Sequence, residues 1–196
     1  MSQTLIRMWD REVVLDRNLC AVMGVMSFIA LTAAGAYIRI PLPFTPVPIT
    51  LQTFFVILAG ALLGKKLGSV SQLGYLLVGI FGLPVFSGGL YGLARLLGPT
   101  GGYLIGFVLA AFAIGKLLGN DDDAPFLKIV GAMLVGLAVL FTVGTFQLAL
   151  VLHISPDKAV ALGVLPFVPG DMVKLLAAAT IYQRVQKQAR KLYPNI

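Results

Sequence analysis

FLKIVGAMLVGLAVLFTVGTFQLALVL, residues 126–152, contains a single charged side chain, Lys128. A helix needs about 20 predominantly apolar residues to cross the hydrocarbon core of a bilayer, so this stretch predicts a transmembrane helix. The composition of the whole chain agrees, because 58% of its 196 residues are hydrophobic and only 12% are charged. Soluble domains carry roughly one quarter charged residues, and most of this surface is therefore not designed for water.

Further apolar runs lie on both sides of this stretch, separated by proline, glycine or charged residues. Together they predict six transmembrane helices, at about 19–38, 50–64, 68–83, 101–118, 126–152 and 166–185. Little length remains for a separate soluble domain, so we expect one all-α integral membrane domain over residues 1–196 with Pro/Gly-rich outer loops. The second run is short, and its helix must borrow residues from the preceding segment or lie where the protein is thin.

The net charge of +7 is explained by membrane topology better than by nucleic-acid binding. The basic residues are spread through an apolar chain instead of forming an exposed basic domain. Short loops on the cytoplasmic side of a membrane are enriched in Lys and Arg. The six-helix arrangement gives one side Arg7, Arg11, Arg17, Lys65, Lys66, Lys116, Lys128, Arg184, Lys187, Arg190 and Lys191, and the other side Arg39, Arg95, Lys158 and Lys174. Both termini are therefore predicted to be cytoplasmic.

This orientation has a chemical consequence for the helices that begin near residues 50, 101 and 166. All three start at the outer face, so their N-termini point outward. A helix N-terminus carries a partial positive charge and unpaired N–H groups, which favour an anion such as a carboxylate. The loops that precede these three helix starts are therefore the candidate ligand-binding segments.

The first candidate loop is RIPLPFTPVPITLQT, residues 39–53. Its prolines at 41, 43, 46 and 48 forbid a continuous helix and enforce an extended path. Two interpretations remain open. The loop is either a rigid connector or a stiff lid over an apolar ligand, which the alternation of apolar side chains and prolines would suit.

The second candidate loop lies within FGLPVFSGGLYGLARLLGPTGGYLIGF, residues 81–107, where many glycines surround Arg95. Glycine lets backbone N–H groups approach a ligand closely. Thr100 is placed to cap the helix that begins at Gly101. Arg95, flanked by leucines near the membrane, must either extend toward water or contact a ligand, and both interpretations stay open.

The third candidate loop is LPFVPGDMVK, residues 165–174, and we expect a helix to start near Asp171. Asp171 and Lys174 are three residues apart and share one face of its first turn. In a structural interpretation, Asp171 is an N-cap and Lys174 its salt-bridge partner. In a functional interpretation, the carboxylate accepts N–H bonds from a ligand and the ammonium donates to a ligand oxygen, as a cyclic urea or carboxylate would require.

Signals for catalysis are weak. GALLGKKL, residues 60–67, resembles a phosphate-binding loop, but its glycines are one residue too close and no Ser or Thr follows the lysine. We identify neither a nucleophile with its base nor a metal-ligand cluster. We therefore expect no ATPase site, no enzyme activity, no metal and no cofactor. An intramembrane enzyme would need catalytic acids or metal ligands around a cavity, and this sequence supplies too few.

The sequence resembles the BioY family, the biotin-specific S components of energy-coupling factor (ECF) transporters. The segments that carry the resemblance are IPLPFTPVPITLQTFFVILAGALLG at 40–64, GLPVFSGG at 82–89, GPTGGYLIGF at 98–107 and PGDMVK at 169–174. The resemblance implies a six-helix fold in a prokaryotic cell membrane, with a biotin pocket near the outer surface. It also implies that the pocket is roofed by the first, third and fifth loops.

The resemblance further implies site residues and partners. Asp171 and Lys174 fall on the family's polar biotin-contacting pair, Ser87, Gly89 and Arg95 in its third-loop wall, and Thr45 in its first-loop lid. The implied partners are a transmembrane coupling protein and two ATPase subunits, which dock on small residues of the first helix. This sequence departs from the expected alanine pair, since Met26 precedes Ala30, and the available pair is Ala30 with Ala34.

The function that follows is capture of biotin outside the cell, for ATP-driven uptake by the partner subunits. Two other transport functions stay open on the sequence. The chain could serve as an S component for another small vitamin, or it could be a self-sufficient biotin facilitator.

Overall fold

A computed structural model describes residues 17–119, 121 and 123–193 of the chain. The predictions for Arg7 and Arg11 concern residues outside these ranges. The helices are α2 (Arg17–Tyr37), α3 (Gln52–Ile80), α4 (Leu93–Leu97), α5 (Gly101–Leu118), α6 (Phe126–Leu152), α7 (Pro156–Gly163) and α8 (Val168–Leu192). Two short strands, β1 (Arg39–Ile40) and β2 (Ile49–Thr50), pair antiparallel. The described part of the chain is thus all-helical apart from this one strand pair.

Several helices have the length and composition of membrane spans. α2, α3, α5 and α6 are each long and apolar enough to cross a bilayer, and the bent pair α7–α8 would add a fifth span. The predicted helices at 101–118 and 126–152 have the bounds of α5 and α6. The structure therefore supports a multi-pass membrane protein.

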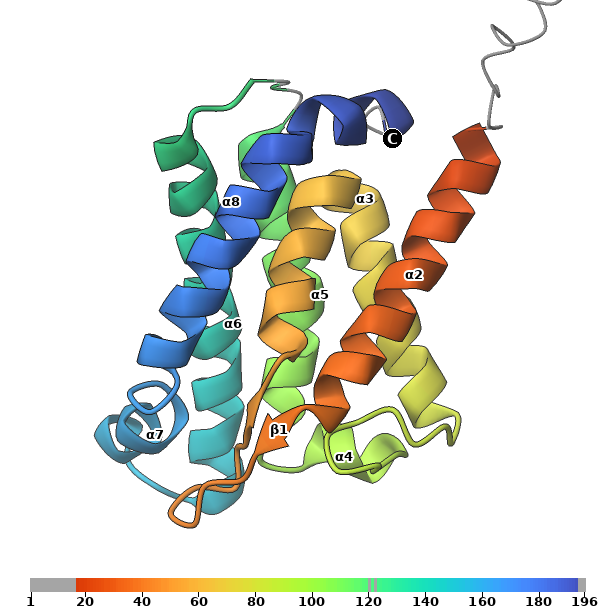
Figure 1. The fold of residues 1–196 in the computed structure, drawn as a ribbon. Coiled ribbons are helices and arrows are strands. Elements are labelled where there is room, and N and C mark those ends of the chain that lie inside the picture. The colour runs from red at the N-terminus through yellow and green to blue at the C-terminus, as the bar shows by residue number, and fades with distance from the viewer. Residues whose placement is uncertain (1–16, 120, 122, 194–196) are drawn as a thin grey trace, which may run out of the picture.

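α3 covers two of the predicted helices, 50–64 and 68–83, and reverses direction at Gly64. Gly64 has φ 77° and ψ −176°, a conformation that glycine adopts readily and side-chain-bearing residues do not. Figure 1 shows the two resulting arms, residues 52–63 and 65–80, running in opposite directions. The first arm is only about 18 Å long at 1.5 Å per residue. Extended chain from the strand pair continues this arm to the end of the bundle (Figure 1).

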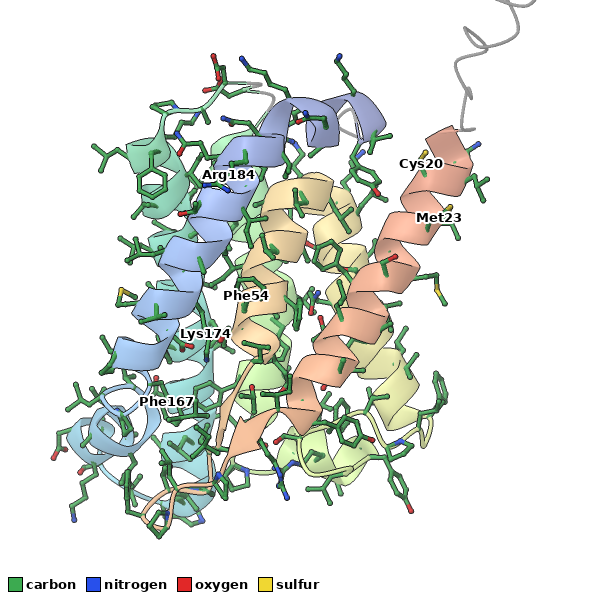
Figure 2. All side chains as sticks on the ribbon, viewed as in Figure 1. Cys20, Met23, Phe54, Phe167, Lys174 and Arg184 are labelled. Carbon is green, nitrogen blue, oxygen red and sulfur yellow. The ribbon has the colours of Figure 1, made fainter. Side chains whose placement is uncertain are left out.

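The connecting segments separate into two groups at opposite ends of the bundle. One end, which we call the terminal end, carries the start of α2, the last turns of α8 and the Gly64 reversal (Figure 1). The other, which we call the loop end, carries the strand pair, α4 and α7. Along the last helix, Figure 2 shows Phe167 and Lys174 toward the loop end and Arg184 toward the terminal end.

The core consists of two clusters of buried apolar side chains. The first extends from the middle of the bundle to the terminal end and includes Leu58, Ile114, Leu118, Met133 and Tyr182. The second lies toward the loop end and is rich in aromatic residues, among them Tyr75, Phe86, Phe107 and Phe167. The core is therefore mainly aliphatic toward the terminal end and richer in aromatic side chains toward the loop end.

Candidate functional site

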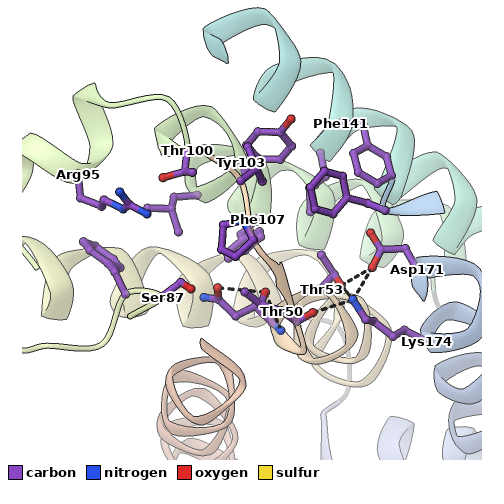
Figure 3. Close-up of a pocket in the computed structure, with 17 residues that line it drawn as sticks. Thr50, Thr53, Ser87, Arg95, Thr100, Tyr103, Phe107, Phe141, Asp171 and Lys174 are labelled. Carbon is purple, nitrogen blue, oxygen red and sulfur yellow. Dashed lines mark hydrogen bonds and ion pairs between the residues drawn. The ribbon is translucent and has the colours of Figure 1, made fainter. Parts of the chain in front are cut away.

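The first turns of α3, α5 and α8 surround one pocket at the loop end. These are the three helix starts that the sequence predicted to share a face. Each contributes side chains to the pocket wall, as Thr53, Tyr103 and Asp171 illustrate (Figure 3). The positive ends of three helix dipoles thus lie at the wall of one cavity, an arrangement that favours a ligand with anionic or carbonyl oxygens.

Most of the pocket wall is apolar. Its large side chains are Phe86, Tyr103, Leu104, Phe107, Leu140, Phe141 and Phe167. They come from the third loop, α5, α6 and the residue before α8. Val47 and Pro48 of the first loop complete the wall. The proline-rich loop therefore forms part of the cavity and is more than a connector.

The buried pair Asp171 and Lys174 lies at one side of the pocket. Their ion pair measures 2.6 Å from Nζ to Oδ1, with side chains only 3% and 15% exposed. The N-cap prediction for Asp171 is wrong, because α8 already begins at Val168 and Phe167 occupies the N-cap position. The carboxylate is thus held inside the first turn, where its side chain is free to face the pocket.

The hydrogen bonds of this pair leave one carboxylate oxygen for a ligand. Lys174 Nζ donates to Asp171 Oδ1 at 2.6 Å, to the Thr50 carbonyl at 2.6 Å and to Thr53 Oγ1 at 3.1 Å. The Thr53 hydroxyl in turn donates to Asp171 Oδ1 at 2.8 Å. All three ammonium hydrogens are therefore satisfied by protein. Asp171 Oδ2 takes no hydrogen bond from the described residues and can accept one from a molecule in the pocket.

Arg95 lines the pocket from α4, on the side opposite Lys174 (Figure 3). Burial lowers the pKa of its guanidinium from the ordinary value, and the positive charge of Arg39 lowers it further. None of the described carboxylates forms an ion pair with Arg95. Of the two interpretations of Arg95, the structure favours a position that faces the cavity. Its charge remains available to an anion there.

Two hydroxyl groups of the pocket wall lack partners. Ser87 Oγ and Thr100 Oγ1 are buried and make no hydrogen bond with the described residues. Thr100 does sit at the N-cap position of α5, but the predicted cap is absent, because its side chain makes no cap hydrogen bond. A buried hydroxyl without a partner costs about 1–3 kcal/mol, which a ligand atom in the pocket would recover.

Two of the predicted contact residues, Thr45 and Gly89, do not line this pocket. Thr45 is buried and its hydroxyl oxygen accepts a hydrogen bond from the Val47 amide, so it shapes the first loop. Gly89 has φ +71° and its amide donates to the Phe86 carbonyl, so it forms the turn of the third loop. Their roles as direct ligand contacts stay predictions.

Gln52, Thr53 and Tyr75 were not predicted from the sequence. Gln52 Nε2 donates to the Tyr75 hydroxyl at 2.7 Å, which donates to the Val85 carbonyl at 3.0 Å and so connects the first and third loops. Gln52 and Thr53 could have been found, because they are polar residues that open an apolar run. Phe141 carried no such signal, since nothing in the sequence separates it from the lipid-facing phenylalanines of α6.

Comparisons with known proteins agree on one family. The sequence matches the BioY family over residues 10–191. It is 44% identical over 160 residues to the biotin transporter BioY of Thermotoga maritima, covering 82% of this chain and 92% of that protein. It is 45% identical over 159 residues to the probable biotin transporter BioY of Pyrococcus horikoshii, covering 81% and 91%. The solved S-component for biotin from an ECF-type ABC transporter superposes with a TM-score of 0.82 at 30% identity, covering 88% of this chain and 94% of that chain.

Proposed function

The chain belongs to the BioY family, and from this premise we propose that it binds biotin in the loop-end pocket as the substrate-capture subunit of a vitamin importer. The family is one of transporters, so the protein is a transport subunit and not an enzyme. Biotin is the transported ligand and not a cofactor. One observation of the structure carries the assignment of the site: an aromatic cavity has a hydrogen-bond acceptor, Asp171, at one side and, at the other, Arg95, which pairs with none of the described carboxylates.

The chemistry of biotin matches these two sides. Its ureido N–H groups need acceptors, its fused ring and valeryl chain are apolar, and its carboxylate is anionic. Lys174 is already neutralised by Asp171, whereas Arg95 has no acidic partner among the described residues. We therefore place the ureido group against Asp171 Oδ2 and the carboxylate toward Arg95, with the apolar parts along the phenylalanines.

The finer membrane arrangement is part of the proposal. Counting the two α3 arms separately gives six crossings within one domain, over residues 1–196, with both termini in the cytoplasm of a prokaryotic cell. Lys65 and Lys66 support this orientation, because they are exposed beside the Gly64 reversal at the terminal end. The pocket then faces the outside, where the vitamin is captured from the medium.

The proposed partners are a transmembrane coupling protein and two ATPase subunits. The solved relative is described as the S-component for biotin from an ECF-type ABC transporter, and we infer that this chain likewise works with other subunits of such a transporter. Ala30 and Ala34 are exposed on one face of α2 and offer a flat surface of small residues against which another helix can pack. Toppling or rotation of the whole subunit against this partner would then deliver biotin to the cytoplasm.

Calorimetry with biotin on the detergent-purified protein tests the proposal. We expect one biotin per chain and no competition by thiamine or riboflavin. Absence of biotin binding by folded protein would refute both the ligand and the pocket. Uptake of biotin into liposomes that contain this chain alone would instead identify a self-sufficient facilitator, and competition by another vitamin would identify a different ligand.

A further inference from the structure

A second arginine lies close to the pocket without lining it. Arg39, at the start of β1, is exposed, and its guanidinium rests on the backbone of Gly88 in the third loop. A Cβ atom built on Gly88 would lie 2.5 Å from Arg39 Nη1 and 3.1 Å from its Cζ. Gly88 also has φ +87°, a backbone conformation that favours glycine, and the absence of a side chain there leaves room for the guanidinium. The guanidinium of Arg39 therefore packs against the third loop at Gly88.

This contact with Gly88 places Arg39 beside the pocket wall. Ser87, the residue before Gly88, lines the cavity, and its buried hydroxyl has no partner among the described residues. The charge of Arg39 also acts on Arg95, whose pKa it lowers. Arg95 thus lines the cavity, and the exposed Arg39 lies against Gly88, the residue next to Ser87 of the cavity wall.

Two neighbouring cations repel each other unless an anion lies between them. The described carboxylates do not supply that anion. Asp121 pairs with Lys128, Asp123 with Lys187 and Asp171 with Lys174. The fourth described carboxylate, Asp157 on α7, forms no ion pair with either arginine. The charge at this side of the pocket is therefore unbalanced in the protein alone.

We propose that Arg39, held on Gly88, and Arg95 together form a two-cation site at the pocket mouth that selects ligands with a free carboxylate. This inference rests on the proposed function, because it names the groups that recognise the acidic end of the same ligand. Arg39 draws the carboxylate toward the mouth, and Arg95 holds it where water is partly excluded. The hydroxyl of Ser87 lies beside this position as a further donor.

The test compares biotin with biotinamide, which has the same shape but no charge. We expect Arg39→Gln to weaken biotin binding roughly three- to tenfold and to change biotinamide binding by less than about twofold. Arg39→Lys keeps the charge and should retain most of the preference for the acid. Lys158→Gln is the matched control, because it removes an exposed cation from α7 at the same end of the molecule. It should leave both affinities unchanged.

Gly88→Ala provides a second, independent variant. The new methyl group displaces the guanidinium of Arg39, so the acid-over-amide preference should fall as it does in Arg39→Gln. Equal losses for biotin and biotinamide in Arg39→Gln would overturn the inference, because Arg39 would then only support the loops. Unchanged affinity for both would overturn it as well. A wild-type protein that binds biotin and biotinamide equally would refute the charge selection alone, whereas one that binds neither would refute the proposed function with it.

Discussion

Replacing Asp171 by asparagine tests the polar side of the pocket with the smallest change of shape. The amide oxygen can still accept the hydrogen bonds that Thr53 and Lys174 give to Oδ1. The amide nitrogen would then stand where Oδ2 faces the cavity, and it presents N–H groups to the ureido N–H groups of biotin. The variant therefore exchanges a charged acceptor for a donor while it keeps the local packing.

The expected loss follows from the hydrogen bond removed. A hydrogen bond to a charged group contributes about 1.5–3 kcal/mol. At about 1.4 kcal/mol per tenfold change, biotin should bind roughly 10- to 150-fold more weakly. The side chain of Asp171 is only 3% exposed, so solvent screening does not reduce this figure much.

Titration calorimetry on purified Asp171→Asn protein measures the change, and the thermal midpoint shows whether the variant is folded. Asp157→Asn is the matched control, because it neutralises an exposed acid at the same end of the molecule. Asp157→Asn should bind biotin as the wild type does. If folded Asp171→Asn binds biotin within about twofold of the wild type, the carboxylate does not contact the ligand and the proposed orientation is wrong.

Three further variants test the supporting structure. Lys174→Met removes the ammonium that holds the Thr50 carbonyl, so the amides of Val47, Ile49 and Thr50 should exchange hydrogen faster even without ligand, and biotin should bind more weakly. Unchanged exchange would show that the first loop is held by other contacts. Gly79→Ala places a methyl group into the ring of Phe86, which lines the pocket, and should cost about 1–3 kcal/mol of stability, measured as a lower thermal midpoint together with weaker biotin binding. Gly64→Ala should lower the free energy of unfolding by about 1–3 kcal/mol, seen as a lower thermal midpoint, because alanine is strained at φ 77° and ψ −176°. A midpoint equal to that of the wild type would mean that the α3 reversal accommodates alanine without cost.

The apolar runs predicted the long helices well, since length and composition decide them. The bounds 101–118 and 126–152 agree with α5 and α6. A change of direction between the predicted helices 50–64 and 68–83 was expected at Lys65 and Lys66. The sequence did not show that Gly64 alone makes this reversal, with helix continuing directly on both sides of it. α8 continues to Leu192, beyond the predicted residue 185, because its charged last turns still bury Gln186 and Arg190.

The site was predictable where its residues follow a helix start or sit in an unusual loop. Asp171, Lys174 and Arg95 were predicted for these reasons, whereas Ser87 was named only through the resemblance to the BioY family. All four line the pocket. The aromatic wall was not predictable, because in a membrane protein an apolar side chain can face lipid, core or cavity with the same local pattern. The unpartnered hydroxyl of Thr100 was also missed, since capping explained a threonine before a helix equally well.

The mainly aliphatic cluster fills the bundle between the pocket and the terminal end. Leu58, Ile114, Met133 and Tyr182 fill the space through which a vitamin would have to travel toward the terminal end. Under the proposed function, biotin that enters the pocket from the loop end can leave only from the loop end. Net import then requires the whole subunit to reorient in the membrane. Such a chain is suited to work as one part of an ATP-driven transporter and is unsuited to work as a channel.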